Sequence, residues 1–379
     1  MPKFSIDKDI MCTGLNLFAR KQDVSIDVDL VGGMIAKIQR QSGEIPWCED
    51  EKTDPWDHVE AAMGLSIGGF LKEARKAYKW LARMQLKDGS WYASYMNGIP
   101  EDKTRDTNLS SYIAVGVFHY YLITGDLTFL EEMWPTIKSA INFALDMQAP
   151  GGEICWAISP EGRVDPMALL TGSCSVYMSI KCALAVAEQL GYTMPTWIEG
   201  LSRLKYAIQY KPDLFNRAKS NYSMDWFYPI LSGVITGHRA QQRIEKFWEK
   251  FVINGQGVRC VSDRPWITVA ETCELTLALS AMGSLSLSER IFSWIRNRTN
   301  NDGSYWCGFT CPAMTIWPQY KTTWTNAAVL IAADAIYNLT PACRLFSHRF
   351  WNASTSSYLS GLPKPEKVMS QRPPAKRMA

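Results

Sequence analysis

The stretch HVEAAMGLSIGGFLKEARKAYKWLARMQ, residues 58–85, decides the fold of this chain. Its first half is small and apolar on nearly every side as far as Gly68, which is typical of a buried helix. Its second half places Leu71, Ala74 and Tyr78 on one face at helical spacing, which predicts an amphipathic helix outside the first. The stretch therefore predicts a hairpin of one inner and one outer helix.

The same pair of helices recurs along most of the chain, with a repeat of about fifty residues. Helices of the inner type are expected to begin near residues 57, 107, 168, 222, 267 and 322. Buried and amphipathic helices that alternate at this period predict an all-α fold, the (α/α)6 toroid, in which a double ring of helical hairpins closes on itself. Within this pattern, we expect Gly125 to end one helix and Pro135 to kink or restart the next.

The toroid is expected to cover residues 53–345, between two segments of different composition. Residues 1–52 are predicted to be an extension that packs on the toroid. Their strand-like stretch VSIDVDLVGGMIAKI predicts a small β-hairpin around Gly32 and Gly33. Residues 346–379 are rich in Pro, Ser and Lys, which predicts a largely disordered tail.

Composition and charge exclude several classes of protein. The chain has 379 residues and a formal net charge of +3, so no basic excess points to nucleic acid. We see no signal peptide and no apolar segment long enough to span a membrane. The ten cysteines are scattered, which favours free thiols and a cytoplasmic setting. Cys307 and Cys311 lack a second pair of ligands, so we expect no metal site and no cofactor.

Two Asp-Gly-Ser turns follow outer helices, at residues 88–90 and 302–304. We expect Gly89 to adopt a positive φ, so that the turn carries the chain from an outer helix back to the next inner one. These turns are therefore predicted to mark the repeat rather than the chemistry. Trp91, directly after the first turn, either plugs the space between hairpins or lines the mouth of a pocket.

Two families resemble parts of the sequence. KAYKWLARMQLKDGSW, residues 76–91, resembles the glutamine-tryptophan repeat of terpenoid cyclases and their protein-prenyltransferase relatives. Residues 120–143 and 151–191, which contain LTFLEEMWPTIKSAINF and GGEICWAISPEGRVDP, resemble the six-hairpin glycosidases, namely glucoamylase, trehalase and debranching domains. As a whole, the sequence is similar to bacterial (α/α)6 proteins that are often labelled prenyltransferase.

The catalytic motifs that these resemblances imply are incomplete. Terpenoid cyclases use an Asp-x-Asp-Asp acid, but only Asp27 and Asp29 come near that pattern, and the Asp, Cys and His zinc set of prenyltransferases is absent. The glycosidase resemblance implies a general acid Glu directly after a tryptophan. That place reads Trp156-Ala157, and Glu153 is the alternative acid.

Carboxylates at the starts of inner helices are the candidates for catalysis. An inverting glycosidase needs a general acid and a general base roughly 6.5–9.5 Å apart. Glu271 and Glu274 are the first candidates, because Glu274 lies in an apolar run where a carboxyl group must be paired or have a raised pKa. Thr268 with Glu271 also fits a capping box.

Asp57, Glu60 and Asp106 are the next candidates. Asp57 and Glu60 fit a capping box equally well, and Asp106 fits a plain N-cap. Aromatic and polar side chains near the same helix starts are predicted to bind the substrate, and these are Trp56, His58, Trp91, Arg105, Glu153, Asp225, Asp263, Arg264, Trp266, Lys321 and Trp324.

The favoured interpretation is an enzyme that acts on a small-molecule substrate, a sugar or glycoconjugate, by carboxylate acid/base chemistry. One alternative is a protein like the terpenoid cyclases or prenyltransferases, with a prenyl lipid in a deep apolar cavity and its carboxylates turned outward as caps. Another is a toroid that binds without catalysis. Carboxylates that face one cavity distinguish the first interpretation from the second.

Overall fold

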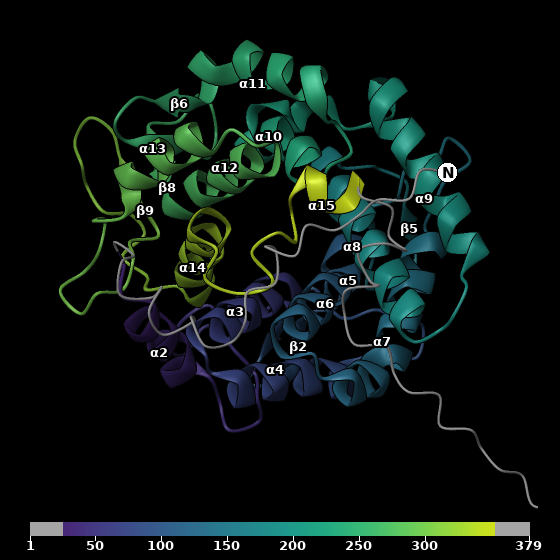
Figure 1. Cartoon of the computed structure of the whole chain (residues 1–379). Coiled ribbons are helices and arrows are strands. Elements are labelled where there is room, and N and C mark those ends of the chain that lie inside the picture. Colours follow the sequence, from purple (N-terminus) through teal and green to yellow (C-terminus); the bar gives the residue numbers. More distant parts are fainter. Residues whose placement is uncertain (1–25, 353–379) are drawn as a thin grey trace, which may run out of the picture.

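A computed structural model gives the structure of the chain and describes residues 26–352. Two rings of helices surround a common axis (Figure 1). The inner ring consists of α3 (Pro55–Gly68), α5 (Thr107–Ser111) continued by α6 (Ile113–Thr124), α8 (Leu170–Gln189), α10 (Ser223–Leu231), α12 (Val269–Ala281) and α14 (Thr323–Tyr337). Each of these packs on the next, and α14 packs on α3, which closes the ring. The predicted (α/α)6 toroid and its inner-helix starts are confirmed.

The outer ring is formed by the amphipathic helices. These are α2 (Val28–Ile38), α4 (Leu71–Met84), α7 (Leu127–Asp146), α9 (Pro195–Tyr210), α11 (Gly237–Phe251) and α13 (Leu285–Ile295). Outer helix α4 buries one face, including Ala74, Tyr78 and Leu81, whereas inner helix α3 buries nearly all of its residues. These two helices therefore occupy the rings that their hydrophobic patterns predict.

Short strands lie in the connections that lead from outer to inner helices. β1 (Ser94–Met96) and β2 (Ile99–Asp102) form a hairpin. A second antiparallel sheet joins β3 (Arg105–Asp106), β4 (Ala157–Ile158) and β5 (Val164–Asp165). A third joins β6 (Val252–Ile253), β7 (Gly257–Arg259), β8 (Trp266–Thr268) and β9 (Gly308–Thr310), and short 3-10 helices cover Pro212–Leu214 and Arg217–Asn221.

The predicted hairpin around Gly32 and Gly33 is wrong, because these glycines lie inside helix α2. Asp27 caps the helix by accepting a hydrogen bond from the amide of Leu30 at 2.9 Å. A Cβ atom at Gly32 would lie 3.0 Å from the Cα of Gly68, so glycine lets α2 approach α3 closely. Helix α2 packs between α3 and α14 and takes the outer position at the seam of the ring.

Helix α7 runs without a break through Pro135, so the expected restart is not found. Proline removes the hydrogen bond to the carbonyl of Glu131, four residues earlier. Both residues are exposed, and the freed carbonyl faces water on the outer surface of the toroid. The expected end at Gly125 is confirmed, because this glycine adopts φ 65° directly after α6.

A repeated clip joins successive hairpins. In each copy a glutamine side-chain amide donates to the carbonyl of a turn glycine four residues later and to a carbonyl of the next outer helix. The three clips are Gln39 with Gly43 and Glu73, Gln85 with Gly89 and Thr136, and Gln148 with Gly152 and Gly200. The three glycines have φ angles of 99°, 92° and 101°, so the positive φ expected at Gly89 is confirmed.

Both Asp-Gly-Ser turns are built alike. Gly303 has φ 87°, close to that of Gly89. A Cβ atom at Gly89 would lie 2.2 Å from the carbonyl oxygen of Ser139 on α7, and one at Gly303 would meet Leu30 on α2 at 2.7 Å. Each turn thus packs on the next outer helix, and α2 serves as that helix at the seam.

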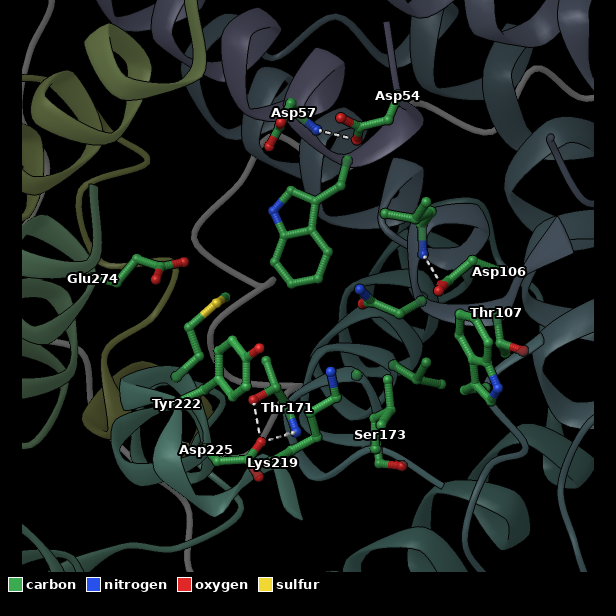
Figure 2. A pocket seen from close by; sticks show the side chains of 18 of the residues that line it. Asp54, Asp57, Asp106, Thr107, Thr171, Ser173, Lys219, Tyr222, Asp225 and Glu274 are labelled. Atoms are coloured by element: carbon green, nitrogen blue, oxygen red, sulfur yellow. Dashed lines mark hydrogen bonds between the residues drawn. The ribbon is translucent and has the colours of Figure 1, made fainter. Parts of the chain in front are cut away.

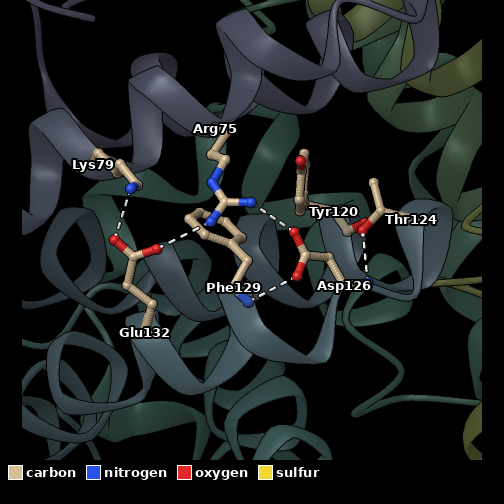
Figure 3. A network of polar contacts seen from close by, with 7 residues as sticks. All are labelled: Arg75, Lys79, Tyr120, Thr124, Asp126, Phe129 and Glu132. Atoms are coloured by element: carbon tan, nitrogen blue, oxygen red, sulfur yellow. Dashed lines mark hydrogen bonds and ion pairs between the residues drawn. The ribbon is translucent and has the colours of Figure 1, made fainter.

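A polar network ties α4 to α7 on the outer surface (Figure 3). Arg75 pairs with Asp126 at 2.7 Å and with Glu132 at 3.2 Å, and Lys79 also reaches Glu132 at 2.8 Å. Asp126 in turn caps α7 through the amide of Phe129. Partly exposed pairs such as these contribute at most about 1 kcal/mol each.

Short helix α15 (His348–Asn352) lies near the centre of the ring (Figure 1). Its His348 ring nitrogen is 2.6 Å from the carbonyl oxygen of Ile230 on α10, and the Trp351 ring lies 6.2 Å from that of Phe118 on α6. The start of the segment that we predicted to be a disordered tail is therefore packed, and residues 353–379 lie outside the described residues. Of the helices described, α8 alone is long and apolar enough to cross a membrane, and most of it is buried in the toroid.

Candidate active site

A cavity of about 460 Å³ opens at the end of the toroid where the inner helices begin (Figure 2). Residues from the first turns of all six inner positions line it, so the ring axis brings together side chains far apart in sequence. Eight predicted site residues are among the lining residues, namely Trp56, Asp57, Glu60, Asp106, Asp225, Glu271, Glu274 and Trp324.

The carboxylates of α3 and α12 occur in the same helical register. Asp57 and Glu271 are the third residues of their helices, and Glu60 and Glu274 are the sixth. Residues three apart on a helix lie on one face, one turn apart. The four carboxylates therefore form an upper pair at the mouth of the cavity and a lower pair one turn deeper.

The lower pair consists of two glutamates whose surroundings raise their pKa values. Glu60 accepts hydrogen bonds from the Trp56 indole at 2.7 Å and from the Tyr112 hydroxyl at 3.4 Å. Burial raises the pKa of Glu60 to about 7, against the lowering effect of the Trp56 hydrogen bond. Burial, followed by the charges of Glu60 and Glu271, raises the pKa of Glu274 well above its usual value. Its carboxyl group points into the cavity in Figure 2.

In the upper pair, one of the two alternatives for Asp57 and Glu60, the capping box, is wrong. Asp54 is the N-cap of α3, and it accepts from the amide of Asp57 at 2.9 Å and from the indole of Trp47 at 2.5 Å. Burial, and then the charge of Asp54 and a hydrogen bond with it, raise the pKa of Asp57 well above its usual value. Asp57 thus has no capping role, and its raised pKa favours the protonated form.

Glu271 is also free of the capping role that its sequence allowed. The side chain of Thr268 makes no capping hydrogen bond to α12. The Oε2 atom of Glu271 is buried without a hydrogen-bond partner among the described residues. A bound water or substrate hydroxyl would satisfy this oxygen.

Asp106 is the N-cap of α5, as one of the two alternatives predicted. It accepts from the amide of Leu109 at 2.9 Å. Burial raises its pKa to about 6, which the amides of Leu109 and Asn108 oppose. Its carboxylate therefore has a structural role even though it borders the cavity.

The wall near α10 carries polar groups suited to sugar hydroxyls. Asp225 accepts from the Thr171 hydroxyl at 2.6 Å and from its amide at 3.2 Å (Figure 2). Burial raises the pKa of Asp225, and Thr171 opposes the shift. Among the described residues that line the cavity, Lys219 carries the one positive charge, and it lies 4.9 Å from the centre of the Tyr222 ring.

A second stretch of the wall is aliphatic. Its side chains come from the starts of α5, α8 and α10 and from the segment before β4, whereas the paired carboxylates come from α3 and α12. They are Leu109, Ile154, Leu169, Val176 and Met224. The cavity thus combines this aliphatic surface with the carboxylates of α3 and α12 and with the polar groups near α10.

Three predicted binding residues are buried elsewhere. Trp91 is 1% exposed and donates to the carbonyl of Leu81, so it plugs the space between hairpins. His58 is fixed between the Ile45 amide and the Ala77 carbonyl, and burial lowers its pKa to about 4. Glu153 is outside the cavity wall, and its carboxylate lies beside Gly151.

The remaining predicted binding residues lie on the rim rather than in the cavity. Arg105 pairs with Asp88, and Lys321 pairs with Asp302 at 2.6 Å, so each cation holds an Asp-Gly-Ser turn. Asp263 and Arg264 are exposed in the turn before β8. Trp266 donates its indole N–H to the carbonyl of Trp317 at 2.7 Å.

Sequence reasoning missed lining residues in the first turns of α5, α8 and α10 and in the connections before the inner helices. They are Asp54, Thr107, Asn108, Trp156, Thr171, Ser173, Lys219, Tyr222 and Met224 together with small and aliphatic neighbours. A signal existed for Asp54, because an Asp before Pro55 is a typical helix start with proline at N1. No group of three metal-ligating side chains is found within residues 26–352.

Comparisons with known proteins identify one relative by sequence and several by fold. No protein-family model matches the chain. Over 312 residues it is 48% identical to the MMP endo-(1,4)-3-O-methyl-alpha-D-mannosidase of Mycolicibacterium hassiacum, which covers 82% of this chain and 86% of that protein. The GH63 mannosylglycerate hydrolase of Thermus thermophilus, solved with Tris and D-glycerate, superposes with a TM-score of 0.64 at 11% identity, over 80% of this chain and 99% of its own. A wild-type glycosidase has a TM-score of 0.63 at 12% identity, over 87% and 100%.

Proposed function

This chain belongs to the family of the MMP endo-(1,4)-3-O-methyl-alpha-D-mannosidase and is a glycoside hydrolase, and we propose that it cleaves internal α-1,4 links in chains of 3-O-methylmannose. The observation that carries the proposal is the set of paired carboxylates that face one cavity at the same level of two inner helices. Acid and base must approach a glycosidic bond from different sides, so one is drawn from α3 and the other from α12.

We assign Asp57 as the general acid and Glu271 as the general base. Burial and the neighbouring carboxylates raise the pKa of Asp57, which is the direction that a general acid requires. Glu271 has an oxygen that no described protein group engages, so it can accept a proton from water. Both lie at the mouth of the cavity, where a chain can enter from the side of the rim.

In the reaction, Asp57 gives its proton to the glycosidic oxygen while the bond from that oxygen to C1 breaks. Glu271 removes a proton from a water molecule whose oxygen forms the new bond to C1. One product chain carries a new hydroxyl and the other a new reducing end. Proton exchange with solvent then restores both carboxyl groups.

The lower pair of carboxylates supports the acid. The charges of Glu60 and Glu274 both raise the pKa of Asp57, in addition to burial and Asp54. These residues therefore act through Asp57, and we regard them as positioning residues rather than as proton donors. This revises our expectation from sequence, which gave Glu274 the acid role.

The aliphatic wall supports a methylated sugar. Leu109, Leu169 and Met224 offer no hydrogen-bond partner to a hydroxyl group, and a buried hydroxyl without a partner costs about 1–3 kcal/mol. A methyl ether presents carbon to such a wall and donates no hydrogen bond. The wall therefore suits the 3-O-methyl group named for the relative.

The other interpretations receive less support. A prenyl-lipid protein should turn its carboxylates outward, but here they line the cavity.

A cytoplasmic setting is part of the proposal, because the nine cysteines that the structure describes are all free thiols.

The test is incubation of the protein with an α-1,4-linked 3-O-methylmannose oligosaccharide and mass spectrometry of the products. We expect shorter methylated chains from the wild-type protein and a loss of about 1,000-fold in kcat for Asp57→Asn. Asp302→Asn, which makes the same change at the surface, is the matched control and should keep its activity. Asp57→Asn protein with wild-type kcat would contradict the assignment of the acid.

A further inference from the structure

Two packed tryptophans, the exposed Trp317 and the half-buried Trp266, lie outside the cavity wall. Trp317 is 57% exposed, and its ring centre lies 5.1 Å from that of Trp266 in an edge-to-face arrangement. Burial of the exposed Trp317 ring against the apolar face of a ligand is favourable. The proposed reaction does not use this pair.

The indole pair is held rigidly. The amide of Trp317 donates to the carbonyl of Gly308 on β9 at 2.9 Å, and its carbonyl accepts from the Trp266 indole. A Cβ atom at Gly308 would lie 2.6 Å from the Trp266 ring nitrogen, so the Trp266 ring rests on bare backbone. Both ends of the Trp317 peptide unit are thus fixed while its ring remains in solvent.

The rim pair is continuous with the cavity. Tyr222 lines the cavity and is 41% exposed, and it forms a β-bridge with Val261 in the loop that leads to Trp266. Trp266 precedes the cavity residue Ala270 by four positions, which is at most about 13 Å of chain. Chain connections through Val261 and Ala270 therefore link Trp266, and with it Trp317, to the wall of the cavity.

We propose that Trp317, supported by Trp266, is a distal sugar subsite that stacks on a pyranose ring of the substrate chain outside the cavity. The inference rests on the proposed function, because a chain cleaved internally must extend beyond the cavity on both sides. The flat indole matches the apolar face of a sugar ring, and a methyl ether adds to that apolar surface.

The surroundings favour a sugar over a protein partner. Asp263 and Arg264, in the turn that leads to Trp266, are exposed and offer hydrogen bonds to the hydroxyl groups of a sugar. A stable protein interface buries about 800 Å² on each partner, which is far more than two indole rings provide. The pair is therefore the size of a subsite for one sugar unit.

The experiment measures kcat/KM on a series of 3-O-methylmannose oligosaccharides of increasing length. Trp317→Ala should lose about tenfold on the longest chain, with the loss growing as the substrate lengthens. Trp317→Phe should restore part of the preference for long chains, because it keeps an aromatic face. The control is Tyr206→Ala, an aromatic residue of similar exposure, 55%, on outer helix α9.

Equal losses at every chain length, or no loss at all, would overturn the subsite. Failure of the proposed function looks different, because the wild-type protein would then cleave none of the series. In that case, calorimetric titration of wild-type and Trp317→Ala protein with the longest oligosaccharide still decides the subsite. Weaker binding by the variant supports it, and equal binding or no binding by the wild type contradicts it.

Discussion

The Asp-Gly-Ser turns after the outer helices contact the N-terminal ends of the inner helices, yet the two regions differ in how far they repeat. After each Asp-Gly-Ser turn, the amide of the aromatic residue donates to a side chain at the fourth position of the next inner helix. Trp91 donates to Ser110 in this way, and Tyr305 donates to Asn326. Both turns therefore make the same contact with the next inner helix.

The inner-helix starts differ from one another. The third position of the six inner helices is occupied by Asp57, Leu109, Gly172, Asp225, Glu271 and Thr325. Since the backbone at this level is set by the repeat, each side chain is free to vary. The comparison teaches that repetition carries the fold in this protein and departures from repetition carry the chemistry. Substitutions in the two regions should therefore have separable effects.

The largest effect is expected at the site. Glu271→Gln should lower kcat about 1,000-fold, because the amide cannot remove a proton from water. The melting temperature should stay equal or rise, since a carboxylate beside buried Glu274 is replaced by a neutral group. Turnover with the methylated oligosaccharide and calorimetric melting check both parts. A large fall in melting temperature would show that the helix starts also carry the fold.

The opposite effect is expected at the turn. Gly89→Val should destabilise the protein by roughly 3 kcal/mol, because φ is 92° and the new Cβ would meet the Ser139 carbonyl at 2.2 Å. Chemical denaturation measures the loss, and kcat per folded molecule should be retained. The control is Gly98→Val, where φ is also positive, at 74°, but the space is open. Equal losses at both glycines would remove the argument for close packing.

The pH dependence should report the acid. The folded pKa of Asp57 is raised, so the catalytic proton is present below that pKa and is lost as pH rises through it. We expect kcat/KM to fall about tenfold per pH unit above it. Glu274→Gln removes a charge that raises this pKa, so the falling limb should move to lower pH. A falling limb that stays at the same pH would show that the lower carboxylates do not raise the pKa of the acid.

The smallest effect is expected from a single clip. Gln148→Ala removes hydrogen bonds to the carbonyls of Gly152 and Gly200, at a cost of about 1–2 kcal/mol in the free energy of unfolding. Activity should not change, because the clip lies outside the cavity wall. Denaturant midpoints measure the loss. Gln189→Ala, which breaks one hydrogen bond with Tyr121 at a part-buried site, is a matched comparison without a clip.

The same contrast explains what the sequence could predict. The toroid followed from helical periodicity, since a repeated pattern offers several independent observations of one rule. The segment around Gly32 misled because its alternating residues imitate a strand, while its glycines serve helix contact with Gly68. That contact depends on the neighbouring helix α3, which comes to lie beside this segment only in the folded toroid.

The site was predictable where chemistry lies on helices. Asp57, Glu60, Glu271 and Glu274 were found because carboxylates in the first turns of buried helices are conspicuous. Thr171 and Lys219 were missed because a threonine or lysine near a loop carries no distinctive pattern. Trp91 is the opposite case, because one of its two predicted roles, lining the mouth of a pocket, is wrong. Its indole is buried and donates to the carbonyl of Leu81.

The seam formed by α2 has a consequence for the order of events during synthesis. The hydroxyl of Thr323 on α14 bonds the carbonyl of Pro46, 277 residues earlier in the chain. At 5–20 residues per second, the ribosome needs roughly 15 to 60 s to deliver that partner. During this time α2, with its buried-type residues Val31 and Ile35, has only one of its two neighbours to cover it. The nascent protein is therefore an open arc whose first helix exposes apolar side chains, and chaperones recognise surfaces of this kind.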